Sequence, residues 1–132
     1  MAFNKKIKIL IIEDDNFLSG FYSKKLSDEN YEVFSAFDGE KGVKIAKEKK
    51  PDLILLDLIL PKMSGFDVIE KLKSGDCKDI PIVLLTNLSE KENIERALSL
   101  GVEDYLIKVY FTPSEIVEKI KKILSKRYKF NI

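Results

Sequence analysis

The chain has 132 residues, of which 45% are apolar and 34% charged, so it is long enough for one domain with a buried core. Its 23 Lys and Arg nearly balance its 22 Asp and Glu, and a formal net charge of +1 gives no overall attraction to nucleic acid or membrane. The absence of histidine excludes a histidine general base and a phosphohistidine donor, and a single cysteine excludes an internal disulfide.

The start of the chain and its one cysteine bear on location and redox chemistry. Residues 1–8 are followed by only four consecutive apolar residues, far fewer than a signal peptide or a membrane span needs, so we expect a cytoplasmic protein. Cys77 lies in a polar stretch, residues 73–79, without a partner thiol or an activating histidine. We interpret it as an incidental loop residue.

Five short apolar runs, rich in branched residues, predict buried parallel strands. A segment with helical spacing of apolar residues follows each of them. Helix-start signals occur at Asp15, at Ser64, at the capping box of Ser89 with Glu92, and at Thr112-Pro113. The strand runs are residues 7–12, 31–34, 53–58, 80–85 and 105–107. The expected buried helix faces are Phe17, Leu18, Phe21, Tyr22 and Leu26; Val43, Ile45 and Ala46; Phe66, Ile69 and Leu72; Ile94, Ala97 and Leu98; and Ile116, Ile120, Ile123 and Leu124.

This alternation predicts an α/β fold in which helices cover both faces of one parallel sheet. Right-handed crossovers leave few topologies, and we expect a doubly wound, five-stranded parallel sheet in the flavodoxin-like order 2-1-3-4-5, with five helices. No linker or repeat interrupts the pattern, so residues 1–132 are expected to form one domain with its core at about residues 7–125.

Polar residues at the ends of the predicted strands form a candidate site. Glu13 and Asp14 end the first strand, Asp57 the third, Thr86 the fourth and Lys108 the fifth. In sheets of this kind ligands bind at the carboxyl ends of the strands, so these side chains should meet at one edge. Asp57 is the most informative, because a carboxylate within an apolar run is costly to desolvate unless a cation or hydrogen-bond donors compensate it.

The combination of these residues is suited to phosphoryl transfer. Three neighbouring carboxylates repel one another and require a positive charge, and oxygen ligands without histidine or cysteine favour Mg²⁺ or Mn²⁺. Lys108 supplies a second cation and Thr86 a hydroxyl donor. An aspartate can then act as the nucleophile toward phosphorus, with the charge of the transferred group met on several sides.

Four stretches, residues 9–15, 51–65, 81–86 and 101–108, resemble the receiver domains of bacterial two-component systems. The resemblance implies that Asp57 accepts a phosphoryl group from a histidine kinase or a phosphotransfer protein. It implies a phospho-acceptor that catalyses only its own phosphorylation and dephosphorylation, rather than an enzyme acting on a separate substrate. It further implies that Asp14 and Asp57 bind Mg²⁺ directly, Glu13 acts mainly through a bound water, and the backbone carbonyl of Ile59 completes the metal site.

The same resemblance implies a switch. Lys108 would pair with the phosphoryl group, Thr86 would move to hydrogen-bond one of its oxygens, and Tyr105 would swing inward into the space that Thr86 leaves. The face formed by the fourth helix, the fifth strand and the fifth helix would then change shape and be read by a downstream protein, or by a second copy in a phosphorylation-dependent homodimer. Direct contacts with nucleic acid or membrane are not expected.

The sequence departs from the family pattern next to two site residues. Val109 stands where the family usually has proline, often after a cis peptide bond, and we expect a trans bond here because a cis bond before valine costs about 2.5–4 kcal/mol. Asn87 stands where a small residue is usual, so its amide either contacts the phosphoryl group or narrows the entrance. Of Tyr110 and Phe111, at least one is expected to be exposed for a partner contact, the alternative being that both only fill the edge of the core.

Three other interpretations compete with a phosphorylated receiver. The first is a pseudo-receiver, a scaffold that takes no phosphate, against which Asp14, Asp57, Thr86 and Lys108 all argue. The second is a flavodoxin-like or phosphatase-like enzyme, although the chain has no glycine-rich phosphate loop and no second aspartate two residues after Asp57. The third is a DNA-binding regulator, for which residues 125–132 are too few, so the chain is either a stand-alone receiver or a fragment of a longer regulator.

Overall fold

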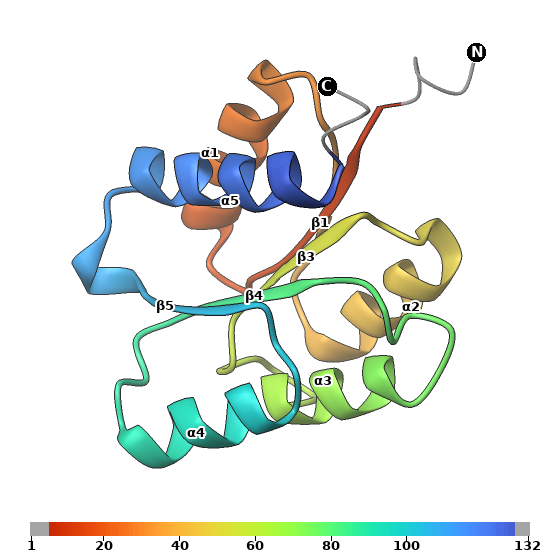
Figure 1. The fold of residues 1–132 in the computed structure, drawn as a ribbon, viewed down its shortest axis with the longest axis vertical. Coiled ribbons are helices and arrows are strands. Elements are labelled where there is room, and N and C mark those ends of the chain that lie inside the picture. The colour runs from red at the N-terminus through yellow and green to blue at the C-terminus, as the bar shows by residue number, and fades with distance from the viewer. Residues whose placement is uncertain (1–5, 129–132) are drawn as a thin grey trace.

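A computed structural model of the chain describes residues 6–128, in which strands and helices alternate from one end to the other (Figure 1). The strands are parallel and lie in the order β2-β1-β3-β4-β5, which confirms the predicted topology. The strands are β1 (Lys8–Ile12), β2 (Glu32–Ala36), β3 (Leu53–Leu56), β4 (Ile82–Thr86) and β5 (Asp104–Ile107). The helices are α1 (Asn16–Asp28), α2 (Gly39–Lys49), α3 (Gly65–Lys73), α4 (Lys91–Ser99), the short 3₁₀ turn η2 (Lys108–Tyr110) and α5 (Pro113–Arg127).

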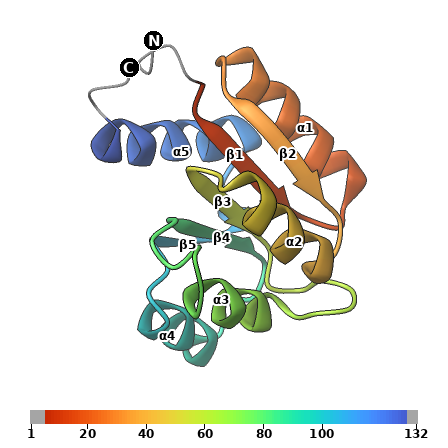
Figure 2. The ribbon, with the colours of Figure 1, turned by 90° about the vertical axis from the view of Figure 1, so that its right-hand side faces the viewer.

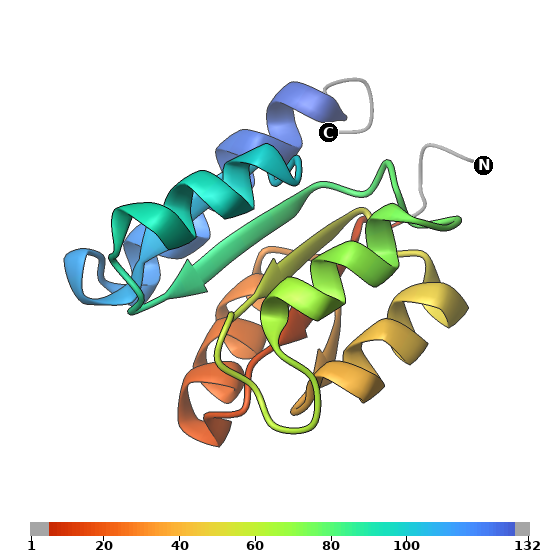
Figure 3. The same ribbon diagram turned by 90° about the horizontal axis from the view of Figure 1, so that it is seen from below.

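The helices form one layer on each face of the sheet. Helices α1 and α5 cover one face, and α2, α3 and α4 cover the other (Figure 1). Helices α2 and α3 lie side by side (Figure 3). Because successive strand residues point to opposite faces, Leu10 and Ile12 of β1 belong to the core beneath α2 and α3, whereas Ile9 and Ile11 belong to the core beneath α1 and α5. Among residues 6–128, no helix is both long and apolar enough to cross a lipid bilayer.

Side-chain caps begin most of the helices where the sequence predicts them. The carboxylate of Asp15 accepts from the backbone N–H of Leu18, and the hydroxyl of Ser64 accepts from that of Asp67. Thr112 and Glu115 form the complete capping box of α5. These caps position the loops after β1, β3 and β5, which all lie at the carboxyl edge of the sheet.

The predicted capping box of Ser89 with Glu92 is wrong. Helix α4 begins at Lys91, its N-cap is Glu90, and no side chain there hydrogen-bonds to the helix backbone. Ser89 lies one residue before the cap, so its spacing to Glu92 does not match a capping box. The carboxylate of Glu90 instead accepts from the side-chain amide of Asn93, at 3.0 Å.

Two expected buried helix faces are also partly wrong. On α4, Ala97 is buried as predicted, but Leu98 is 52% exposed. Phe17 and Phe21 of α1 are exposed, at 78% and 37%, because α1 contacts the sheet through a narrower stripe than the five apolar residues suggested, with Tyr22 and Leu26 at its centre. Cys77 lies in the loop between α3 and β4, as predicted, but it is part of the core beneath α2 and α3: its side chain is only 2% exposed and its Sγ lies 3.5 Å from the carbonyl oxygen of Ala46.

Candidate functional site

Three carboxylates lie together where β1 and β3 end. These strands are neighbours and pair Ile12 with Leu56, so the residues that follow, Glu13 and Asp57, emerge side by side at the carboxyl edge. Glu13 and Asp57 are buried, whereas Asp14 is exposed. One oxygen of each carboxylate lies within 4.8 Å of the others, close enough for all three to share one cation.

Lys108, the first residue after β5, reaches the two buried carboxylates. Its Nζ lies 2.6 Å from Oε1 of Glu13 and 2.7 Å from Oδ2 of Asp57. The lysine side chain is 15% exposed and its partners are 3% and 8% exposed, so water screens these contacts only weakly. The ammonium group thus compensates two carboxylates that would otherwise repel each other.

The pKa values in this cluster follow from burial and pairing. Burial raises the pKa of Glu13, although hydrogen bonds from Lys108 and from the backbone N–H of Asp15 act in the opposite direction. Burial by itself would lower the pKa of Lys108, but its hydrogen bonds and charge interactions with Asp57 and Glu13 outweigh burial and raise that pKa. Lys108 therefore remains charged at neutral pH and can meet an anion beside Asp57.

The carboxylate of Asp57 is held in a fixed orientation. Its Oδ1 accepts from the backbone N–H of Ile59 at 3.2 Å, and its Oδ2 accepts from Lys108. Ile59 lies in the loop between β3 and α3, and its side chain is 59% exposed. Two hydrogen bonds from different segments thus fix the Asp57 carboxylate, and the apolar side chain of Ile59, two residues later, is exposed to solvent.

Thr86 of β4 and Tyr105 of β5 share a neighbour, Leu88. Thr86, the last residue of β4, is fully buried, and its hydroxyl oxygen accepts from the backbone N–H of Leu88 at 3.4 Å. The half-buried phenol of Tyr105 donates to the carbonyl oxygen of Leu88 at 2.7 Å. The loop after β4 therefore contacts both of the residues predicted to form the switch.

A sequence model of the response regulator receiver domain matches residues 9–121. The chain belongs to the response regulator receiver domain family. Its function is therefore phosphorelay signalling, and it is a receiver domain rather than a classical enzyme.

Relatives and solved structures agree with this assignment. The chain is 38% identical to a probable transcriptional regulator, ycf27, of Porphyridium aerugineum over 91% of the chain and 49% of the relative. It is also 38% identical to the DNA-binding dual master transcriptional regulator RpaA of Synechocystis, over 89% of the chain and 48% of the relative. A CheY-like receiver domain protein from Methanospirillum hungatei superposes with a TM-score of 0.87 at 28% identity, covering 95% of this chain and 98% of that protein. The chain thus spans about half the length of these curated relatives.

The loop after β5 shows how this receiver accommodates valine in place of proline. No cis peptide bond occurs among the described residues, so the bond before Val109 is trans, as predicted. The backbone N–H of Val109 donates to Oδ1 of Asn87 at 3.1 Å. Tyr110 is 69% exposed and Phe111 packs partly into the core beneath α5, so the prediction that at least one ring is exposed is confirmed.

Tyr22 of α1, which was expected only as part of a buried helix face, also interacts electrostatically with the site. It is buried, and burial raises its pKa to about 12, with a lowering contribution from Lys108 and raising contributions from Glu13, Asp15 and Asp57. Its phenol therefore lies within the electric field of the carboxylate cluster and remains protonated. Helical spacing predicted that Tyr22 is buried, but only the packing of α1 against β1 brings it near the site.

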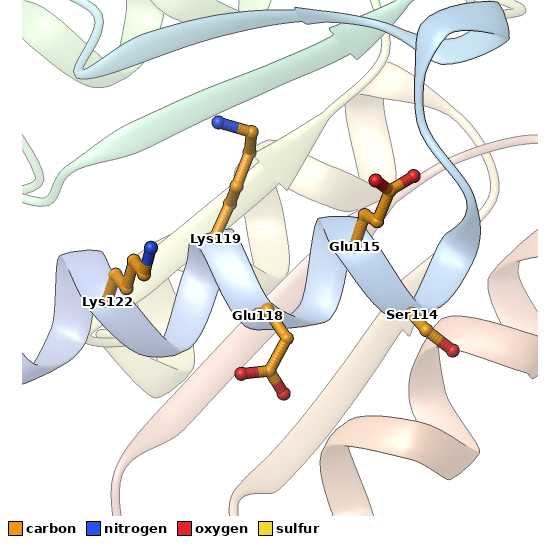
Figure 4. A pocket seen from close by; sticks show the side chains of 5 residues that line it. All are labelled: Ser114, Glu115, Glu118, Lys119 and Lys122. Atoms are coloured by element: carbon orange, nitrogen blue, oxygen red, sulfur yellow. The ribbon is translucent and has the colours of Figure 1, made fainter.

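A hollow on the outer surface of α5 is separate from the carboxylate cluster. The side chains that line it do not converge on a common point (Figure 4). Glu115, moreover, already hydrogen-bonds to Thr112 in the capping box. The lining residues are Ser114, Glu115, Glu118, Lys119 and Lys122, and none of them is a predicted site residue.

Proposed function

We propose that Asp57 accepts a phosphoryl group from the phosphohistidine of a sensor histidine kinase or a phosphotransfer protein, and that residues 1–132 form one receiver domain with its core at about residues 7–125. The observation that carries this proposal is the buried Asp57 carboxylate, which is paired with Lys108 at 2.7 Å and lies beside Glu13 and Asp14. Family membership supports the kinase as the source of the phosphoryl group.

The donor set fits a hard divalent cation, Mg²⁺ or Mn²⁺. Three carboxylates whose oxygens approach within 4.8 Å provide the all-oxygen environment that these ions prefer. We assign Asp14 and Asp57 as direct ligands, Glu13 as a ligand through water, and the backbone carbonyl of Ile59 as the remaining protein ligand. When bound, the ion would neutralise the carboxylates and the phosphoryl oxygens.

Transfer requires an oriented nucleophile and a fixed positive charge. An oxygen of Asp57 forms a bond to phosphorus as the bond from phosphorus to the donor imidazole nitrogen breaks, and that nitrogen keeps the electron pair. The N–H of Ile59 and the ammonium of Lys108 hold the Asp57 carboxylate in place. Lys108 then pairs with the transferred group, because its charge is already in position and needs no reorganisation.

The new charge on Asp57 is proposed to shift the domain between two conformations. Thr86 turns its hydroxyl toward a phosphoryl oxygen, and Tyr105 moves inward once its hydrogen bond with Leu88 is released. The face of α4, β5 and α5 changes with them and is read by a downstream protein or by a second copy of the chain. We also propose a role in the control of transcription, which the names of the relatives support, and a cytoplasmic location, which family membership supports.

The proposal is tested by the intact mass of the protein after treatment with acetyl phosphate and Mg²⁺. Wild type is expected to gain one phosphoryl mass, and Asp57→Asn is expected to gain none. A matched control is Asp76→Asn, because Asp76 is exposed and lies in the loop before β4, away from the carboxyl edge; it should be phosphorylated as wild type is. A wild-type protein that gains no mass, or an Asp57→Asn variant that gains as much, would favour the pseudo-receiver alternative or another acceptor.

A further inference from the structure

A side chain ties the loop after β5 to the end of β4. The two strands pair through Thr86 and Ile107, the last residues of each strand. Beyond this pair the backbone ladder stops, and the N–H of Val109 donates to the side-chain oxygen Oδ1 of Asn87, at 3.1 Å. In a longer sheet, a backbone carbonyl of β4 would accept this hydrogen bond; here the side-chain oxygen of Asn87 accepts it instead. The hydrogen bonding between the two segments therefore continues beyond the last paired residues.

Lys108 lies between these two fixed points. Ile107 on one side is held in the ladder, and Val109 on the other is held by Asn87. Lys108 also starts the turn η2, which is closed by a hydrogen bond from the N–H of Phe111 to the carbonyl oxygen of Lys108, at 3.2 Å. From this position its Nζ reaches the carboxylates that it bridges.

Burial holds only the far end of this turn, where Phe111 packs partly into the core beneath α5. Val109 and Tyr110 are 73% and 69% exposed, so the apolar effect does not fix their backbone. In the part of the chain that the structure describes, Asn87 makes the only side-chain hydrogen bond to the backbone of residues 109–111. The direction in which Lys108 leaves the sheet edge therefore depends on this contact.

We infer that Asn87 is a positioning residue for Lys108: it acts through the backbone N–H of Val109 and keeps the ammonium group directed at Asp57. This inference rests on the proposed function, because it concerns how Lys108 is positioned to pair with the phosphoryl group. It predicts that loss of the Asn87 amide weakens the contribution of Lys108 to phosphoryl transfer and leaves the metal ligands unchanged. A direct contact between the Asn87 amide and the phosphoryl group is the competing explanation for any effect of this residue.

Proline provides the test that separates these two explanations, because it has no N–H for Asn87 to bind. Asn87→Ala is expected to slow phosphorylation by acetyl phosphate at saturating Mg²⁺ by about two- to tenfold, the range for loss of one hydrogen bond. In the Val109→Pro background the same Asn87→Ala substitution is expected to have no further effect. An equal loss in both backgrounds would overturn the inference and show that the amide acts on the phosphoryl group itself.

Two further measurements keep the inference separate from the proposed function. The Val109 amide of unphosphorylated protein is expected to exchange with solvent deuterium faster in Asn87→Ala than in wild type, while Mg²⁺ affinity stays the same. An unchanged exchange rate, or a fall in Mg²⁺ affinity as large as the fall in rate, would overturn the positioning role. If wild type takes no phosphate at all, the proposed function fails, and the exchange rate of Val109 alone decides whether Asn87 holds the loop.

Discussion

Replacing Lys108 with methionine should destabilise the fold, because it leaves two buried carboxylates without their cation. Oxygens of Glu13 and Asp57 lie within 4.8 Å of each other, and at an effective dielectric constant of about 20 their repulsion is about 3 kcal/mol. This agrees with the loss of about 3–5 kcal/mol that follows when one partner of a buried ion pair is removed. We therefore expect Lys108→Met to lower the free energy of unfolding by about 3 kcal/mol near neutral pH, measured by urea denaturation.

The stability that Lys108→Met loses should depend on pH, and the pKa of Glu13 sets the direction of that dependence. Burial already raises the pKa of Glu13 above its ordinary value of 4.5, whereas Lys108 lowers that pKa. Removal of Lys108 would therefore raise the pKa of Glu13 further. An acid whose pKa is higher in the folded state binds more protons there, so the folded state is favoured at low pH and stability is lost as pH rises through the folded-state pKa. The gap between Lys108→Met and wild type should thus be smaller at about pH 5 than at about pH 8.

Lys121→Met is the matched control for this prediction. Nζ of Lys121 lies 2.9 Å from Oε1 of Glu29, a similar contact, but the two side chains are 33% and 42% exposed. Solvent screens such a pair, so little change in stability is expected at either pH. The reasoning would be refuted by equal losses for the two substitutions, or by a Lys108→Met loss that does not change with pH.

Three further substitutions address the metal site, the switch and the lifetime of the phosphoryl group. Asp14→Ala should abolish phosphorylation by acetyl phosphate while the circular dichroism spectrum stays native, because Asp14 is exposed and its removal relieves repulsion; normal phosphorylation of this variant would contradict the metal site. Thr86→Ala should still accept phosphate but no longer shift the NMR signals of Tyr105 when a phosphoryl mimic binds, and identical shifts in wild type and variant would disprove the coupling. Ile59→Asn should speed loss of the phosphoryl group about tenfold by orienting a water, and equal decay rates would show that this position does not control water access.

The topology and the grouping of site residues were predictable from the sequence for one physical reason. Parallel strands present their carboxyl ends at one edge, so polar residues that end apolar runs must meet there. Glu13, Asp14, Asp57 and Lys108 gather as this rule predicts. The rule does not specify contacts, and the pairing of Lys108 with Glu13 as well as Asp57 depends on the length and direction of the side chain.

Other features depended on three-dimensional packing that local patterns do not encode. The exposure of Phe17 is set by how much of α1 the sheet covers, and the burial of Cys77 by how the loop before β4 folds against α2. The contact between Asn87 and Val109 joins two residues 22 positions apart. Both were recognised in the sequence as departures from the family pattern, but the strand register was needed to show that they are partners (Figure 2 shows β4 and β5 side by side).

The most direct test of the central proposal is to locate the phosphoryl group itself. Borohydride reduces an aspartyl phosphate to homoserine, so reduction of the protein after acetyl phosphate treatment, followed by peptide mass mapping, marks the acceptor residue permanently. We predict homoserine at position 57 alone, and none when Mg²⁺ is removed with EDTA beforehand. Reduction at Asp14 or Glu13, or no reduced residue in a protein with native circular dichroism and bound Mg²⁺, would contradict the assignment of Asp57 as the phospho-acceptor.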